Sequence, residues 1–206
     1  MASRRCRCRI EAEKKRALAL IPAEFGVPRL AEVKPDPKRH PEQGAKIAFL
    51  KANPGKSYFL YGDNGTGKTF MGWSLYVHAV EEGRKAVMVE LDALLKGYRR
   101  YQFRHDENGE VVDKYRPPVM AEDLIDATRK WTIFLDEIGA TTPSEYAAKE
   151  FFYLLKAAHE HGHQMIYTCN VSPQALQKHW SKVDDFWGNS IARRIAEYSQ
   201  QVKLFR

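Results

Sequence analysis

A glycine-rich turn that ends in a lysine and a threonine is the feature of this chain best suited to chemistry. In YFLYGDNGTGKTF, residues 58–70, four residues separate Gly62 from Gly67, and Lys68 and Thr69 follow directly. Glycines let the backbone curl so that several N–H groups point at phosphate oxygens, and the N-terminus of a following helix adds positive potential. The pattern predicts a phosphate-binding loop in which Lys68 contacts the β- and γ-phosphates and Thr69 holds Mg²⁺.

The loop and the first turn of the helix after it are expected to surround the nucleotide. The residues concerned are Asn64, Gly65, Thr66, Gly67, Lys68, Thr69 and Phe70. The alternative is a glycine-rich turn with a chance Lys-Thr pair. An apolar strand-like run before the turn and a helix-like run after it favour the phosphate-binding loop.

A pair of adjacent carboxylates supplies the second half of a hydrolytic site. In WTIFLDEIG, a mostly apolar run places Asp136 and Glu137 at the end of a predicted strand. We expect Asp136 to position Mg²⁺ through its water shell and Glu137 to orient and deprotonate the attacking water. The alternative is an acidic pair at a strand exit. The pair favours hydrolysis over transfer to a small molecule, which needs an acceptor site.

Polar residues in the C-terminal part of the chain complete this site. Asn170 follows MIYTC, on a strand expected beside the other two, where its amide holds the lytic water or senses the γ-phosphate. A role in a turn is the alternative. Arg193 and Arg194 lie on a predicted helix in NSIARRIAEY. A guanidinium suits the charge on a transferring phosphoryl group, in its own site or in a neighbour's; the alternative is a basic helix surface.

Strands that alternate with helices must position these residues. We predict strands in SYFLYG, KAVMVELD, WTIFLDEIG, HQMIYTCN and QVKLF, and helices in GAKIAFLKAN, GKTFMGWSLYVHAVEEG, ALLKGYRRYQF, AEDLIDATRK and SEYAAKEFFYLLKAAHEHG. Residues 104–118 contain an Asn-Gly turn and predict a small hairpin. The alternation predicts an α/β fold with a parallel sheet covered on both faces. Ligands of such sheets bind at the carboxyl ends of the strands, where three of the motifs lie.

The chain divides into an N-terminal segment and one domain. Residues 1–43 form a basic tail and a proline-rich connector, with seven Lys and Arg against two Glu in residues 1–20 and five of the ten prolines in residues 21–43. The tail predicts a helix near EAEKKRALAL, and the connector predicts extended structure. Residues 44–206 are the predicted ATPase domain.

Composition narrows the setting and the partners. The formal net charge of +7 favours a polyanionic partner, nucleic acid ahead of anionic lipid, although solubility alone also accounts for it. Three cysteines, Cys6, Cys8 and Cys169, form no disulfide framework and predict a reduced, cytoplasmic setting. No apolar run approaches the roughly 20 residues that span a bilayer, so we expect no membrane partner.

These motifs, in this order, resemble the AAA+ ATPases, and within them the helicase loaders and transposition helpers of the DnaC/IstB-like group. The likeness runs over residues 21–206. It implies a three-layer αβα P-loop NTPase with a five-stranded parallel sheet, ATP and Mg²⁺ at the loop, and a homo-oligomeric ring or spiral. The resemblance assigns Lys68 and Thr69 to Walker A, Asp136 and Glu137 to Walker B, Asn170 to sensor 1, and Arg194, or else Arg193, to the arginine finger presented to a neighbour.

Two regions depart from that family. Residues 171–206 are too few for a full helical lid, so we expect a reduced C-terminal lid. Family members also carry a helicase-binding domain, often with zinc, before the ATPase core. Here Arg4-Arg5-Cys6-Arg7-Cys8 resembles the tail of such a module, and two cysteines do not close a four-ligand zinc site. We expect either a truncated protein or a member without the module.

A basic and aromatic segment is the predicted DNA-binding surface. The residues predicted to contact DNA are Lys96, Tyr98, Arg99, Arg100, Tyr101 and Arg104. Cations neutralise phosphates, and aromatic faces stack on unpaired bases. The resemblance places the segment at a central channel for single-stranded DNA. Alternatively, Tyr98 and Tyr101 share a buried helix face. The basic N-terminal tail is a second candidate.

Four functions remain open. The first is an ATPase, stimulated by DNA or assembly, that loads a replicative helicase onto single-stranded DNA. The second is a transposition helper ATPase that binds duplex DNA and a transposase. The third is a small-molecule kinase, which the absence of an evident acceptor motif disfavours. The fourth is a nucleotide-dependent binding module with negligible turnover.

Overall fold

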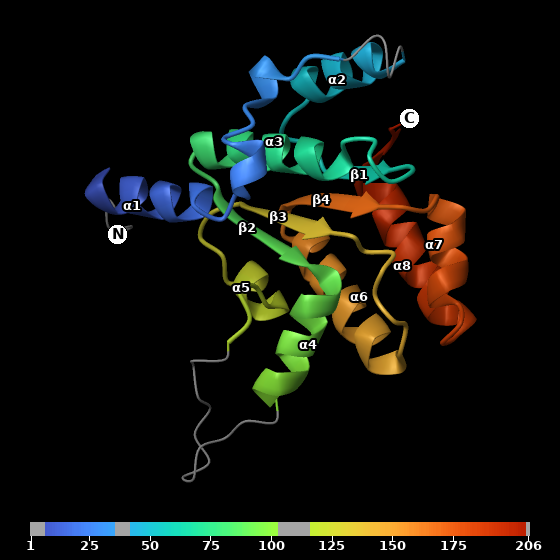
Figure 1. Ribbon diagram of the computed structural model, residues 1–206. Helices are drawn as coiled ribbons and strands as arrows, with labels where there is room; N and C mark the ends of the chain where they lie inside the picture. The colour runs from blue at the N-terminus through green and yellow to red at the C-terminus, as the bar shows by residue number, and fades with distance from the viewer. Residues whose placement is uncertain (1–6, 36–41, 103–115, 205–206) are drawn as a thin grey trace, which may run out of the picture.

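A five-stranded parallel sheet separates two layers of helices (Figure 1). The computed structural model describes residues 7–35, 42–102 and 116–204. The strand order is β2-β3-β4-β1-β5, and every adjacent pair is parallel. The strands are β1 Tyr58–Tyr61, β2 Lys85–Glu90, β3 Trp131–Asp136, β4 Gln164–Cys169 and β5 Gln200–Lys203. The predicted α/β class and the five parallel strands are confirmed.

Helices cover both faces of the sheet. The upper layer in Figure 1 holds α1 Arg7–Leu18, α2 Gln43–Ala52 and α3 Lys68–Glu81. The lower layer holds α4 Leu91–Gln102, α5 Ala121–Ile125, α6 Glu145–Glu160, α7 Pro173–Trp180 and α8 Asp185–Tyr198. Among the described residues, no helix has the length and apolar character needed to cross a membrane.

The central strands are buried on both faces, which explains their nearly continuous apolar sequence. All six residues of β3 are buried. Its side chains alternate, so that Ile133 and Leu135 join the core beneath the sheet while Phe134 joins the core above it. The register pairs Leu135 with Tyr167 of β4, which brings the ends of these two strands together.

Helix α3 lies very close to the sheet because Gly72 faces Phe134. A Cβ atom at Gly72 would lie 2.3 Å from the ring of Phe134, closer than carbon atoms can approach. The helix begins directly after the phosphate-binding loop. Its fixed distance from β3 therefore sets the position of that loop relative to Asp136.

Helices α6, α7 and α8 of the lower layer begin at side-chain caps. The Ser144 hydroxyl accepts a hydrogen bond from the amide of Ala147 at the start of α6. Ser172 caps α7 in the same way, and Asp184 caps α8. These two helices, which pack on each other and on α6, form the C-terminal part of the layer.

The residues before α2 pack on the domain. The connector contains two single 3₁₀ turns, η1 Ala23–Phe25 and η2 Leu30–Glu32, and Leu30 belongs to the upper core. The Tyr76 hydroxyl of α3 donates a hydrogen bond to the Ala17 carbonyl, 3.2 Å away, and Arg129 pairs with Glu13 at 2.6 Å. The N-terminal helix is thus fixed to α3 and to the loop between α5 and β3.

Two predicted elements differ from the structure or lie outside it. The helix predicted over AEDLIDATRK ends at Ile125, because Asp126 and the residues after it favour turns over helix. The hairpin predicted for residues 104–118 falls almost wholly on residues 103–115, outside the described residues.

Candidate active site

The polar motifs meet at the carboxyl edge of the sheet. Strands β3 and β1 are both hydrogen-bonded to β4, so the residues that follow these three strands are neighbours. A hollow of about 310 Å³ lies there. It is lined by Phe25, Asn64, Gly65, Gly67, Lys68, Thr69, Phe70, Glu137, Thr168 and Asn170. Two larger hollows, of about 440 and 460 Å³, lie at α1 and at α5–α6, and neither is lined by the phosphate-binding loop, the acidic pair or Asn170.

The loop leaves backbone donors available for an anion. Gly65 and Gly67 have φ values of 76° and 84°, the left-handed region that favours glycine. Gly67 is the N-cap residue of α3, and no side chain caps this helix. Its first N–H groups therefore have no side-chain partner and face the hollow with the positive end of the helix.

Lys68 is held inside the loop. The residue is 7% exposed, and its ammonium donates to the carbonyls of Gly62 at 2.9 Å and Asp63 at 2.8 Å. Burial lowers the pKa of Lys68, and the negative charges around it, including Asp136 and Glu137, oppose this shift. A cation that is shielded from water attracts an anion strongly.

The Asp136 carboxylate accepts two hydroxyl hydrogen bonds. The hydroxyl of Thr69 donates to Asp136 Oδ1 at 3.3 Å, and the hydroxyl of Thr168 donates to the same oxygen. Thr168 also accepts a hydrogen bond from the amide of Glu137, 2.9 Å away. Glu137 is exposed and lines the hollow, and its φ is 52°. The backbone therefore leaves the extended conformation of the strand at Glu137.

These residues fit a triphosphate with magnesium. Uncapped amides and a shielded ammonium match phosphate oxygens. The Thr69 hydroxyl and the Asp136 carboxylate offer the oxygen ligands that Mg²⁺ prefers. Within the described residues, no three His, Cys, Asp or Glu side chains gather to hold a metal on their own. Cys6 and the side chain of Cys8 lie outside that part of the structure.

Two residues of the site were not predicted from the sequence. Thr168 is 1% exposed, and its role follows from the β3–β4 register. The available signal was a hydroxyl residue two positions before Asn170. Phe25 reaches the hollow from η1, where its ring meets Phe70 with centroids 6.0 Å apart. Nothing in the local sequence of the connector indicates this contact.

The family model of IstB-like ATP binding proteins matches residues 34–204. The chain belongs to the IstB-like ATP-binding protein family. The family is one of ATP-binding proteins, and it places the chain in the AAA+ group of DnaC/IstB-like proteins.

Solved replication proteins share the fold of this IstB-like protein. A DnaI crystal structure is 17% identical, with a TM-score of 0.68, and covers 90% of this chain and 95% of its own. The DnaC helicase loader is 13% identical, with a TM-score of 0.64, and the match covers 89% of this chain and 99% of the DnaC chain. The replication initiator DnaA bound to AMPPCP and single-stranded DNA is 14% identical, with a TM-score of 0.60. The match covers 90% of this chain and 51% of the DnaA chain. The TM-scores show a common fold, and at such low sequence identities the likeness shows the fold alone.

Curated sequences of chromosomal replication initiator DnaA are also similar. The protein from Campylobacter fetus subsp. fetus is 26% identical over 128 residues, which are 61% of this chain and 26% of that protein. The chain thus spans about a quarter of the length of the curated relatives it matches.

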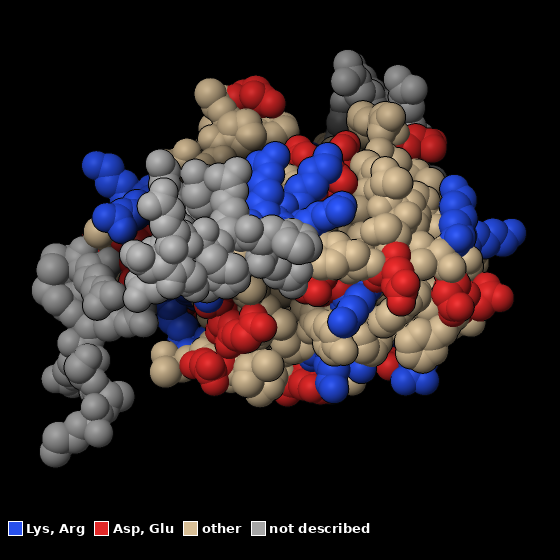
Figure 2. Space-filling model, turned by 90° about the horizontal axis from the view of Figure 1, so that it is seen from below, with Lys and Arg blue, Asp and Glu red and all other residues tan. Residues whose placement is uncertain are grey.

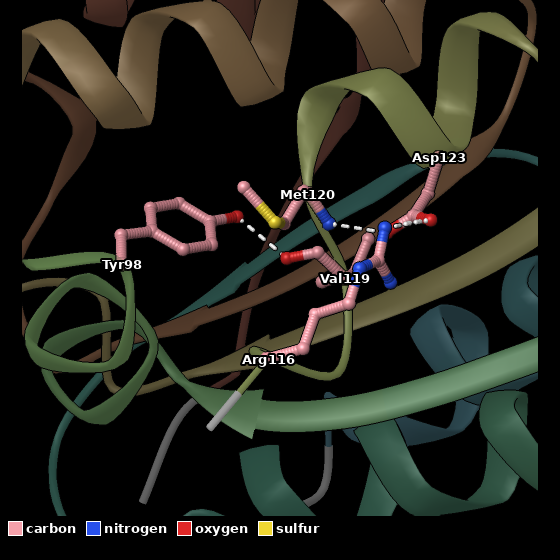
Figure 3. Close-up of polar contacts among 5 residues, drawn as sticks. All are labelled: Tyr98, Arg116, Val119, Met120 and Asp123. Carbon is pink, nitrogen blue, oxygen red and sulfur yellow. Dashed lines mark hydrogen bonds and ion pairs between the residues drawn. The ribbon is translucent and has the colours of Figure 1, made fainter. Parts of the chain in front are cut away.

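The basic segment of this IstB-like protein lies on α4, and one predicted DNA contact on it is wrong. Tyr98 is 4% exposed, belongs to the core beneath the sheet and donates a hydrogen bond to the Val119 carbonyl at 2.8 Å (Figure 3). A side chain in this position cannot stack on a base. Burial raises the pKa of Tyr98 well above its usual value, so the hydroxyl stays protonated and donates.

The cations of α4 point outward. Lys96, Arg99 and Arg100 are exposed, with Lys96 paired to Asp92 at 2.6 Å, while Tyr101 is half-buried. Figure 2, which shows the underside of the molecule, has Lys and Arg side chains gathered beside the residues drawn in grey. Arg104 lies outside the described residues.

The two arginines of α8 do not line the hollow. The guanidinium of Arg194 lies over the ring of Phe152 on α6, 4.6 Å from its centroid. Arg193 is exposed and pairs with Glu197 at 3.4 Å. Neither arginine contributes to the pocket of its own chain as the structure describes it.

Proposed function

We propose that this protein hydrolyses ATP at the hollow and uses the cycle to load a replicative helicase onto single-stranded DNA. The observation that carries the proposal is the convergence of Lys68, Glu137 and Asn170 on one hollow, where Thr69 also donates a hydrogen bond to Asp136. Fold likeness to the DnaC helicase loader supports the biological role.

The residues of the pocket divide the chemistry among them. Lys68 exchanges its two loop carbonyls for β- and γ-phosphate oxygens. Glu137 accepts a proton from the attacking water, whose oxygen forms a bond to the γ-phosphorus while the bond to the ADP oxygen breaks. Asn170 orients that water. Mg²⁺, held by Thr69 and Asp136, would neutralise the charge on the phosphate oxygens.

An arginine from a neighbouring subunit completes the site in this proposal. Arg194 is absent from its own pocket, and its position over Phe152 holds the guanidinium at the surface of α8. A head-to-tail assembly, a ring or a spiral, would bring this surface to the pocket of the next subunit. Hydrolysis then depends on assembly.

The exposed cations of α4 are the proposed contacts to single-stranded DNA. Lys96, Arg99 and Arg100 are available for phosphates, and half-buried Tyr101 offers part of its ring. A solved DnaA structure is bound to AMPPCP and single-stranded DNA, which supports this choice of nucleic acid. Arg104 remains a predicted contact.

The match to the IstB-like family favours a second function, that of a transposition helper. Such a protein would use the same ATP site but would bind duplex DNA and a transposase. The two functions differ in the nucleic acid and the partner, not in the chemistry of the pocket.

Phosphate release, measured without DNA, with single-stranded DNA and with a duplex of the same sequence, separates these functions. A loader releases phosphate to water, fastest with single strands, whereas a helper responds to the duplex. Co-sedimentation of the full chain with a purified hexameric replicative helicase tests the partner. Absence of phosphate release under all three conditions, at a protein concentration that allows assembly, would contradict the ATPase.

A further inference from the structure

Thr168 joins the two carboxylates of the site in a way that the motifs do not describe. Its hydroxyl donates to Asp136 Oδ1 and accepts the amide hydrogen of Glu137 at 2.9 Å. Its carbonyl accepts the amide hydrogen of Ile138 at 3.0 Å. One residue of β4 thus contacts the last residue of β3 and the two residues that follow it.

The only hydrogen of the hydroxyl and one of its two lone pairs are already engaged. The hydrogen is directed at Asp136, and the lone pair is directed at Glu137. Thr168 is 1% exposed, so water does not compete for these bonds. A β-branched side chain in a strand has few χ1 rotamers, which fixes the oxygen in place.

The backbone of Glu137 requires such support. Glu137 is the only described residue other than glycine with a positive φ, 52°. This conformation is unfavourable for a residue with a Cβ atom. It turns the chain out of the strand, so that Glu137 borders the hollow instead of continuing β3. The hydrogen bond from its amide to Thr168 stabilises this left-handed conformation.

We propose that Thr168 is a positioning residue for ATP hydrolysis, whose hydroxyl fixes the Asp136 carboxylate and the Glu137 backbone in one arrangement. The inference rests on the proposed function, since it assigns a role within the same site. Thr168 acts through its neighbours and does not itself take the proton. Because Thr168 lies two residues before Asn170, it also ties the predicted water-orienting strand to the carboxylates.

Three variants test the proposal. Thr168→Val keeps the shape and removes the hydroxyl, and Thr168→Ser keeps the hydroxyl. Thr132→Val is the matched control, because Thr132 is also a fully buried strand threonine and donates to Gln164 Oε1 at 2.9 Å, away from the hollow.

The first readout needs neither ATP nor turnover. Amide hydrogen exchange of Glu137, followed by NMR in the nucleotide-free protein, should accelerate by about tenfold or more in Thr168→Val. It should stay within about threefold of the original protein in Thr168→Ser and Thr132→Val. Unchanged exchange in Thr168→Val would overturn the proposal, whether or not the protein proves to be an ATPase.

The second readout is the division between kcat and KM. We expect Thr168→Val to lower kcat by about 10- to 100-fold with little change in KM, because the carboxylates move while the loop that binds ATP does not. Thr168→Ser should restore most of kcat. If Thr168→Val does not fold, Thr168→Ala takes its place. A kcat in the folded variant equal to that of the original protein would also overturn the proposal.

Discussion

Two buried histidines, His159 on α6 and His163 just before β4, have pKa values below the usual value for histidine. His159 is 8% exposed, stacks on Tyr198 with ring centroids 4.3 Å apart, and lies 3.2 Å from the Tyr167 hydroxyl. Burial, with a smaller contribution from the charge of Arg194, lowers its pKa from 6.5 to about 4. Burial also lowers the pKa of His163, which bridges Trp131 and Leu124.

The first prediction is a loss of stability in mild acid. Between pH 6.5 and about 4 the unfolded chain binds a proton at residue 159 that the folded chain does not, so the free energy of unfolding falls as the pH falls. His159 alone accounts for at most roughly 3 kcal/mol. Urea unfolding from pH 4 to 7 measures this. His159→Phe should flatten the profile, and an unchanged slope would contradict the assignment.

The sequence predicts residues whose partners are local and misses those whose partners are distant. Lys68 and Thr69 follow from the spacing of the loop, because its geometry belongs to one short stretch. Thr168 and Phe25 acquire their roles from strand register and from a ring contact across 45 residues of chain. The position of Thr168 two residues before Asn170 is the one local signal, and the connector gives none for Phe25.

Helix α4 joins the sheet to the segment before α5. The Tyr98–Val119 hydrogen bond makes this link, and Arg116 and Met120 both donate to the carboxylate of Asp123 beside it (Figure 3). The sequence could not tell which face of α4 is buried, since cations and aromatics alternate along it. The packing of Leu94, Leu95 and Tyr98 decides this.

The second prediction follows from this link. Tyr98→Phe leaves the Val119 carbonyl without its partner and should lower the free energy of unfolding by about 1 kcal/mol, measured by urea titration. Affinity for single-stranded DNA should stay within about twofold, because the ring lies in the core. A large loss of DNA affinity with no change in the free energy of unfolding would contradict this prediction and indicate that Tyr98 contacts DNA.

On the scale of the whole molecule, the third prediction concerns the exposed cations. Arg99→Ala with Arg100→Ala should weaken single-stranded DNA binding and reduce the slope of log K against log salt by about 1.4, or 0.7 for each charge removed. Lys178→Ala with Lys182→Ala is the matched control, since it removes two exposed cations from the α7 region. Equal losses in both pairs would indicate attraction by net charge alone.

The fourth prediction tests catalysis across subunits. Arg194→Ala and Lys68→Ala should each abolish most turnover when assayed alone. An equal mixture should recover about a quarter of the original rate, because an intact pocket then meets an intact arginine by chance in a head-to-tail assembly. Arg193→Ala, on the adjacent exposed residue, should remain active. A mixture with no recovery would contradict action in a neighbouring subunit.

The most direct test of ATP hydrolysis at this edge of the sheet is the identity of the nucleotide bound to Glu137→Gln. The amide keeps the size of the side chain and cannot accept the proton of water. After incubation with Mg²⁺ and ATP, the variant should retain ATP, with affinity close to that of the original protein and turnover reduced by about 100-fold or more. Bound ADP, formed at the original rate, would contradict the account.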